Sequence, residues 1–353
     1  VHNGFKYDAG PTVITAPYLI DELFSAHGEK LSDYVNLLPV KPWYRFLFDS
    51  GDYIDYGDKL ISTVHEIKAK YGNDKAKAYL KLLKHSKQIF KKGFIELSDE
   101  PFESIFSMLK HLPALIKIRF DRSVYQTVNK YLNNKNLNEA LSMHPLLVGG
   151  NPYSTTSIYL LIQYLEWKWG VYYAEGGTGR IIDGLEKLLI KKDVNIKKNT
   201  EAKKIILKNN KVVGIDTSQG IIDCDIVVCN SDPTYTYNNL LGLKPKKASN
   251  RFNLKHSMSL FVLYFSTTKI YKDVKHHTII FSKRHYELLN DIFNKKVFVS
   301  DPSLYLHRPG ATDPSMIQNG NDTFYVLAPV PNNLSKIDWN DKGNKLANII
   351  IKN

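Results

Sequence analysis

The sequence predicts an α/β protein of two domains with a ligand cavity. Its 353 residues are 43% hydrophobic, which is enough apolar material for a core larger than that of one small domain. Helical periodicity dominates residues 57–170, whereas short strands, turns and one helix follow residue 170. This order of elements is expected when a chain leaves a helix-rich part and re-enters an α/β layer.

The first half of the chain is expected to begin with a loop, because Gly10 and Pro11 stand where the backbone must turn tightly. Residues 74–94 form the clearest amphipathic helix, with apolar side chains at helical spacing. The other expected elements are a helix over 18–27, strands over 35–42 and 43–56 with a break at 49–51, and helices over 103–118, 122–132, 135–143 and 154–168.

The second half is expected to be rich in strands. A strand over 170–175, a loop over 176–179 and a helix over 180–192 come first. Further strands are expected over 194–197, 201–208, 212–218, 221–229, 259–267 and 324–329, and the last two suggest an antiparallel sheet.

Composition excludes several classes of protein. Cys224 and Cys229 have no CxxC spacing and no clustered histidine or carboxylate partners, so we expect neither a disulfide framework nor a metal site. Two cysteines without a disulfide framework fit a protein of the reducing cytoplasm. No apolar run approaches the ~18 residues of a membrane span. The first residues lack an initiator Met, a basic segment and an apolar segment, so we expect no signal peptide and a chain entered partway.

The formal net charge of +13 comes mostly from lysine, which is densest over residues 68–92 and 191–211. A solvated surface explains most of it. Over 74–94 and 105–120, however, lysine and histidine alternate with apolar residues at helical spacing, and such helices can lie on anionic membranes. No nucleic-acid-binding pattern accompanies the charge, so we expect no nucleic acid partner.

The sequence contains no dinucleotide fingerprint of the GxGxxG type. Gly177, Thr178 and Gly179 come nearest to it, but without a third glycine they indicate a helix entry turn more than a phosphate cradle. Asp8 is a candidate general base, although its place in a turn favours a carboxylate that accepts backbone hydrogen bonds.

Four segments carry a more specific signal: residues 4–14 (GFKYDAGPTVI), 146–158 (LLVGGNPYSTTSI), 169–179 (WGVYYAEGGTG) and 324–331 (FYVLAPVP). They resemble, in order and separation, bacterial phytoene desaturases, which are carotenoid desaturases of the FAD-dependent amine oxidase-like superfamily. By this resemblance the dinucleotide fingerprint and the second flavin-contacting motif fall outside the 353 residues, so we expect a fragment that binds FAD poorly and is colourless when purified.

The resemblance implies an incomplete FAD-binding domain of the Rossmann-like, glutathione reductase type. This domain is interleaved with an α+β substrate domain that has an antiparallel sheet and a helical, membrane-facing part. The implied division assigns residues 1–32 and 171–242 to the FAD-binding domain and 33–170 and 243–353 to the substrate domain, with 57–120 largely helical.

The resemblance also implies the flavin contacts. Gly10, Pro11 and Thr12 match the loop beside the isoalloxazine, where a glycine permits close approach and a backbone amide can bond a ring heteroatom. Positions 176–178 match the loop that returns the chain to the flavin at the domain junction. For each loop a plain turn is the alternative. These matches name Gly176, Gly177 and Thr178 as cofactor-binding residues.

Two further contacts are implied on strands. Ala202 matches the strand whose backbone faces the adenine, and Asn230 follows an expected strand at an edge where such sheets place ligands, although a strand-terminal turn explains it equally well. The family's acidic residue near the substrate lies on the segment that matches 102–110, but Ser107 stands at the acidic position and Lys110 at an arginine position. We therefore name no catalytic residue.

The function implied is FAD-dependent dehydrogenation of phytoene toward lycopene or neurosporene. Electrons would pass to oxygen or a quinone, and the enzyme would bind the cytoplasmic side of the membrane as a peripheral protein. The alternatives are another polyene desaturase, such as a diapophytoene desaturase, a carotene isomerase, an amine oxidase of the same superfamily, and a membrane-surface binding protein without catalysis.

Overall fold

The computed structural model describes residues 4–96, 113, 116, 118–243 and 256–352. These divide into two compact units, one of residues 1–187 and 257–353 and the other of residues 188–256. Among the described residues no helix combines the length and the apolar character needed to cross a membrane.

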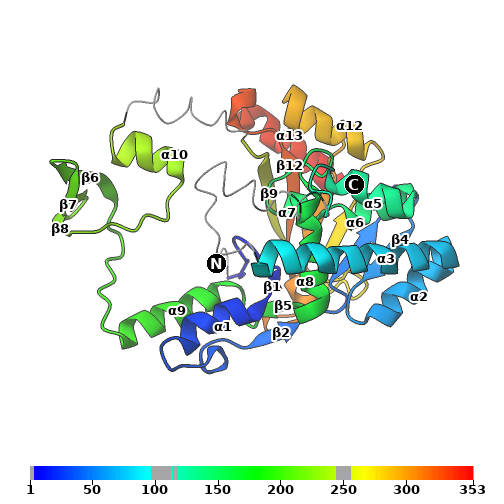
Figure 1. Cartoon of the computed structure of the whole chain (residues 1–353), viewed down its shortest axis with the longest axis horizontal. Coiled ribbons are helices and arrows are strands. Elements are labelled where there is room, and N and C mark those ends of the chain that lie inside the picture. The colour runs from blue at the N-terminus through cyan, green and yellow to red at the C-terminus, as the bar shows by residue number, and fades with distance from the viewer. Residues whose placement is uncertain (1–3, 97–112, 114–115, 117, 244–255, 353) are drawn as a thin grey trace. The chain divides into compact units, whose positions relative to one another are not determined.

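Figure 1 shows the elements along the chain. The α-helices are α1 (Pro17–Ser25), α2 (Leu60–Tyr71), α3 (Asn73–Phe90), α5 (Val124–Leu132), α6 (Lys135–Leu141), α7 (His144–Leu147), α8 (Leu161–Trp169), α9 (Gly179–Lys191), α10 (Pro233–Tyr235), α12 (His285–Asn290) and α13 (Trp339–Lys352). The strands are β1 (Ile14–Thr15), β2 (Leu37–Pro39), β3 (Tyr44–Leu47), β4 (Tyr53–Tyr56), β5 (Val171–Ala174), β6 (Ala202–Lys208), β7 (Lys211–Thr217), β8 (Gly220–Asp223), β9 (Ser259–Thr267), β10 (His277–Ile280), β11 (Leu304–His307) and β12 (Asp322–Val330).

A six-stranded sheet organises the larger unit, in the order β4-β3-β10-β11-β12-β9. All neighbouring pairs are antiparallel except β3 with β10, which is parallel. The register is continuous, so that Tyr264 lies opposite Tyr325, Tyr325 opposite His307, and His307 opposite His277. Because directly paired residues point to the same face, these four side chains form one row across the sheet.

The two faces of this sheet differ along β9. Burial alternates strictly along the strand, since β-strand side chains point to opposite sides in turn. Phe261, Leu263 and Phe265 pack into the cluster that includes Leu346 and Ile350 of α13, which lies beside β12 and β9 in Figure 1. The alternating residues on the other face are exposed.

The helical part packs on the other end of the sheet. Tyr79, Leu82 and Ile89 of α3 recur at helical spacing, and these residues lie in one core with Phe46 of β3 and Val128 of α5. Local signals set the limits of these helices. Ser123 and Gln126, for example, form a capping box at the start of α5.

Two small sheets complete the fold. In the larger unit β5 lies between β1 and β2, antiparallel to both, and this sheet connects the beginning of the chain to residue 171. The smaller unit contains the antiparallel sheet β6-β7-β8. Asn209 and Asn210 both have positive φ at the turn between β6 and β7, as a tight hairpin requires.

Most of the expected elements are confirmed, and two are corrected. Residues 194–197 form no strand, and the strand expected over 221–229 ends at Asp223. Apolar residues alternate with polar ones over 194–197 and are frequent over 221–229, but Val194, Ile226 and Val228 are exposed. A strand needs a neighbour for its backbone hydrogen bonds, which the local pattern cannot supply. Most of the helix expected over 103–118 lies outside the described residues.

Candidate functional site

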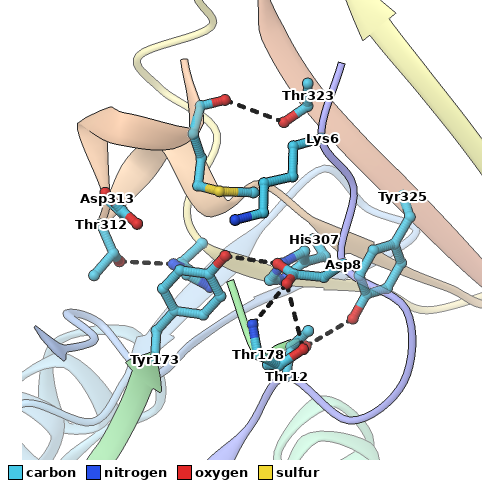
Figure 2. A network of polar contacts seen from close by, with 12 residues as sticks. Lys6, Asp8, Thr12, Tyr173, Thr178, His307, Thr312, Asp313, Thr323 and Tyr325 are labelled. Atoms are coloured by element: carbon cyan, nitrogen blue, oxygen red, sulfur yellow. Dashed lines mark hydrogen bonds and ion pairs between the residues drawn. The ribbon is translucent and has the colours of Figure 1, made fainter. Parts of the chain in front are cut away.

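Asp8 connects the two loops that the sequence singles out. One carboxylate oxygen accepts hydrogen bonds from the Thr178 amide at 2.8 Å and from its hydroxyl at 3.3 Å. The other accepts from the Tyr173 hydroxyl at 2.6 Å and from Nε2 of His307 at 3.2 Å. Figure 2 shows this convergence. Asp8 does accept a backbone hydrogen bond, as predicted, but from a residue 170 positions away instead of from its own turn.

Thr12 anchors the first loop to the six-stranded sheet. Its hydroxyl lies 2.7 Å from the hydroxyl of Tyr325 and 3.1 Å from that of Tyr305 (Figure 2 shows the bond to Tyr325). The Tyr305 hydroxyl also lies 2.6 Å from Nδ1 of His277. Gly10 and Pro11 remain exposed at the tip of the loop, whereas Thr12 is buried. The loop is therefore held at one end and open at the other.

The glycines of the two loops meet different surroundings. Gly10 has a φ of 106°, and a Cβ added to it would meet no atom within 4 Å. Gly177 has a φ of 102°, but its Cβ would lie 2.8 Å from the Asp8 carboxylate. A positive φ favours glycine at both positions. Gly177 is thus also required for the approach of Asp8, while Gly10 leaves an open backbone face.

In the second loop several backbone groups are hydrogen-bonded to other residues of the protein. The Gly176 amide donates to Asp313 at 2.6 Å, the Thr178 amide donates to Asp8, and the Lys6 ammonium donates to the Gly176 carbonyl. Helix α9 begins directly afterwards at Gly179. Residues 177–179 therefore form the helix entry turn that the sequence favours over a phosphate cradle.

Burial and hydrogen bonding set the charge of Asp8. The residue is only 4% exposed, and burial alone would raise its pKa. Hydrogen bonds from His307, Tyr173 and Thr178 outweigh that effect and lower the pKa below its ordinary value. Burial lowers the pKa of His307, although Asp8 opposes the shift. The pair at neutral pH is thus a carboxylate that accepts from a neutral imidazole.

The sheet face beneath the first loop is apolar and partly open. On β9 the side chains of Leu260, Val262 and Tyr264 are 48%, 39% and 43% exposed. Val262 is paired with Leu327, and Leu327 with Tyr305, the tyrosine that contacts Thr12. An apolar surface therefore runs from the Gly10 loop across β12 to the edge strand β9.

Three buried histidines next to Asp8 were missed by the sequence analysis, which expected no metal site. One ring nitrogen from each of His276, His277 and His307 lies within 4.8 Å of those of the other two. The expectation rested on the surroundings of the two cysteines, whereas this cluster forms because β10 pairs with β11 and places His277 opposite His307. The adjacent histidines at 276 and 277 were the only local signal.

The remaining predicted residues are not members of this network or lie outside the described residues. Ala202 is the first residue of β6, and Asn230 is exposed beyond the end of β8 rather than at a strand end. Both belong to the smaller unit. Ser107 and Lys110 lie outside the described residues. Cys224 and Cys229 are free thiols.

Two surface cavities, of about 620 and 420 Å³, are also not part of the network. The larger is lined by residues between Pro17 and Leu37, and the smaller by residues that include Glu139 and His285. The linings of both leave out residues 10–12 and 176–178. The contact between the two loops, and not either of these cavities, therefore marks the candidate site.

Comparison with known proteins decides the family. Residues 2–293 match the family model described as flavin containing amine oxidoreductase. The chain belongs to this family. It is 40% identical over 352 residues to a lycopene-forming phytoene desaturase of Pseudescherichia vulneris, an alignment that covers 98% of this chain and 71% of that protein. It is 35% identical to a neurosporene-forming phytoene desaturase of Rhodobacter capsulatus, over 99% of this chain and 68% of the other.

Solved structures agree on the fold. An oxidoreductase from Methanosarcina mazei matches with a TM-score of 0.54 at 13% identity, over 89% of this chain and 65% of that one. Cyclohexylamine oxidase from Brevibacterium oxydans matches with a TM-score of 0.51 at 9% identity, over 97% and 69%. The mixed α/β fold is thus that of the FAD-dependent amine oxidase-like proteins, and the chain is an FAD-dependent oxidoreductase.

The described residues fit a flavin ring at the first loop. Gly10 is exposed, its backbone face is open, and among the described residues its amide has no hydrogen-bond partner. A free amide on an open glycine suits the edge of a flat heteroaromatic ring. The second loop differs, because the amides of Gly176 and Thr178 already have carboxylate partners. The fit is therefore strongest at Gly10.

Proposed function

We propose that this chain belongs to a phytoene desaturase, which dehydrogenates the saturated carbon pairs flanking the conjugated triene of phytoene. The observation that carries the proposal is the 40% identity over 352 residues to lycopene-forming relatives. The structure supports it with an apolar sheet face that begins beneath the loop best suited to a flavin ring. Relatives that form lycopene and relatives that form neurosporene both align, so the number of steps is an outcome of the experiment.

The chain's own residues have three tasks in this reaction. The bound flavin supplies a hydride acceptor, as flavins do in dehydrogenations. Thr12, fixed by two tyrosine hydroxyls, holds the Gly10 loop against the sheet. Asp8 holds the second loop beside it. Leu260, Val262 and Leu327 give the polyene an apolar surface to lie on, which orients the reacting carbons and excludes water.

We also propose that the protein acts at the cytoplasmic face of a membrane, as a peripheral protein, with oxygen or a quinone as electron acceptor. The substrate is insoluble in water. The apolar face of α3 packs in the core, but its lysine-rich outer face can lie against anionic lipid through charge. The domain division of the sequence analysis and the adenine contact at Ala202 remain part of this proposal. A diapophytoene desaturase of Methylomonas is 28% identical, so another linear polyene is the second candidate substrate.

The test is expression of the complete reading frame that encodes this chain in a bacterium that accumulates phytoene, with chromatography of the pigments. The expected products are lycopene or neurosporene. Unchanged phytoene with flavin-loaded protein present would overturn the proposal, and conversion of diapophytoene instead would establish the second candidate.

A matched pair of variants tests the sheet face. Val262→Asp places a charge on the exposed apolar face of β9, and Leu207→Asp places one on β6, where Leu207 is 43% exposed against 39% for Val262. We expect Val262→Asp to lower pigment formation at least about tenfold, because a carboxylate beside an apolar chain must be desolvated. Leu207→Asp should leave it unchanged. Equal loss in both, at equal flavin content, would remove the sheet face from the substrate site.

A further inference from the structure

The cluster of His276, His277 and His307 lies at the ends of two paired strands. His277 begins β10, His307 ends β11, and the two are directly paired. His276 precedes β10, so the alternation of strand side chains does not carry its ring to the opposite face. The ring centroid of His276 lies 4.4 Å from that of His277 and 4.8 Å from that of His307. All three residues are at most 2% exposed.

Each ring has one nitrogen with an outer partner and one without. Nδ1 of His276 lies 2.7 Å from the Thr312 hydroxyl, Nδ1 of His277 lies 2.6 Å from the Tyr305 hydroxyl, and Nε2 of His307 contacts Asp8. The opposite nitrogens, Nε2 of His276, Nε2 of His277 and Nδ1 of His307, are buried without a hydrogen-bond partner among the described residues. Histidines that bind metals show this arrangement, in which a hydroxyl, carbonyl or carboxylate orients the ring from behind.

Unpaired buried nitrogens are unfavourable unless something binds them. A polar atom buried without a hydrogen bond loses its hydration without compensation, and each of the three rings carries one such atom. When the ring proton sits on the nitrogen that has an outer partner, the opposite nitrogen of each ring presents a lone pair. A neutral imidazole is the form that ligates a metal.

The charges around the cluster also favour a cation. Asp8 is a buried carboxylate, and among the described residues no lysine or arginine pairs with it. Arg308 follows His307 directly, but its guanidinium is bound to the Asp322 carboxylate at 2.5 Å. A cation on His307 would therefore complete a carboxylate–histidine–metal triad with Asp8.

We propose that His276, His277 and His307 form a binding site for a divalent transition-metal ion, with Zn²⁺ as the preferred occupant. Three imidazole nitrogens suit zinc, which binds histidine at about 2.0–2.1 Å in tetrahedral geometry. At that distance the nitrogens stand roughly 3.3 Å apart, so binding draws the rings closer than the 4.8 Å limit within which they now lie. A water molecule would supply the fourth ligand.

The ion would stabilise the surroundings of the Gly10 loop. It would connect β10 to β11, and through Tyr305 and Asp8 it would fix Thr12 and Thr178. This role is independent of the polyene substrate, since it requires only folded protein.

The experiment is zinc and cobalt titration of the purified chain after dialysis against a chelator. A Cys224→Ser/Cys229→Ser background removes the two free thiols, which could bind zinc by themselves. We expect about one zinc per chain by elemental analysis, a Co²⁺ spectrum typical of tetrahedral nitrogen ligands, and a higher melting temperature with zinc. A folded chain that binds neither ion would overturn the proposal.

Variants separate this site from adventitious binding. His276→Gln and His307→Gln should each reduce zinc affinity at least about tenfold. The matched control is His285→Gln, because His285 is equally buried and also has an unpartnered Nε2 but lies outside the cluster. It should bind zinc like the parent. Tyr305→Phe keeps all three ligands and should still weaken binding about tenfold. Parental affinity in the His276 and His307 variants, or in Tyr305→Phe if those two fail to fold, would refute the assignment.

Discussion

Gly177→Ala should destabilise the protein more than Gly10→Ala, although the two glycines have nearly the same backbone conformation. Their φ angles are 102° and 106°, and an alanine in that region costs roughly 1–3 kcal/mol at either position. Only Gly177 has a neighbour in the way. Its Cβ would lie 2.8 Å from the Asp8 carboxylate, whereas at Gly10 no atom lies within 4 Å. Gly10→Ala is thus the control for backbone strain.

The difference between the two variants can be worked from the Asp8 contacts. The carboxylate oxygen that the added methyl group of Gly177→Ala would displace accepts the hydrogen bond from the Thr178 amide at 2.8 Å. A hydrogen bond to a charged group contributes about 1.5–3 kcal/mol. Gly177→Ala should therefore lower the free energy of unfolding by about 1.5–3 kcal/mol more than Gly10→Ala. In a unit of this size each kcal/mol lowers the melting temperature by roughly 2–4 °C.

Urea unfolding followed by tryptophan fluorescence, with calorimetry as a second method, measures this difference. Equal losses of stability in the two variants would refute the reasoning, because they would mean that Asp8 does not hold the second loop. For flavin affinity we expect the opposite order, with the larger loss in Gly10→Ala. Gly10→Ala closes the open backbone face and should weaken flavin binding while most of the stability is retained.

Three further predictions concern buried polar groups. Burial lowers the pKa of His285 to about 4, so below about pH 6.5 the unfolded chain binds more protons than the folded chain, and the free energy of unfolding decreases as the pH is lowered. Between pH 7.5 and pH 5 the parent should therefore lose about 2 kcal/mol more than His285→Gln in urea unfolding. Parallel pH dependence in the two proteins would contradict this. Arg308→Met removes the ion-pair partner of the buried Asp322, which should cost about 3–5 kcal/mol in the same assay. A loss below about 1 kcal/mol would contradict this prediction. Tyr44→Phe removes the 2.8 Å hydrogen bond to the buried Glu166 and should lower the free energy of unfolding by about 1.5–3 kcal/mol. An unchanged free energy of unfolding at pH 7 would disprove this.

The periodicity of apolar residues predicted helices and strands correctly where those residues pack in the core. The strand over 259–267 is β9 residue for residue. Phe261, Leu263 and Phe265 face the α13 cluster, and the residues between them lie on the other face. The helix expected over 74–94 is α3, followed by a π-helical turn. The same reasoning failed at residues 194–197, where alternation is present but no strand forms.

The loops of the candidate site were found from the sequence, but their partners were not. The tight turns around Gly10 and Gly177 are visible as glycines, because few other residues adopt a positive φ. Asp8 contacts this loop from a position 170 residues earlier in the chain. This contact is the reason that position 177 has no room for a Cβ and that the Thr178 amide already has a hydrogen-bond partner. No local pattern encodes such a contact.

The sequence by itself determined the family and the elements of this protein, since similarity over 352 residues and the periodicity of apolar side chains are both properties of the linear chain. Only the tertiary structure decided which polar groups meet. His276 and His277 stand side by side in sequence, but they become a cluster with His307 because β10 pairs with β11 in one particular register. Register is set by the fit of whole side-chain faces against the core, and a shift by one residue would turn every side chain to the other face.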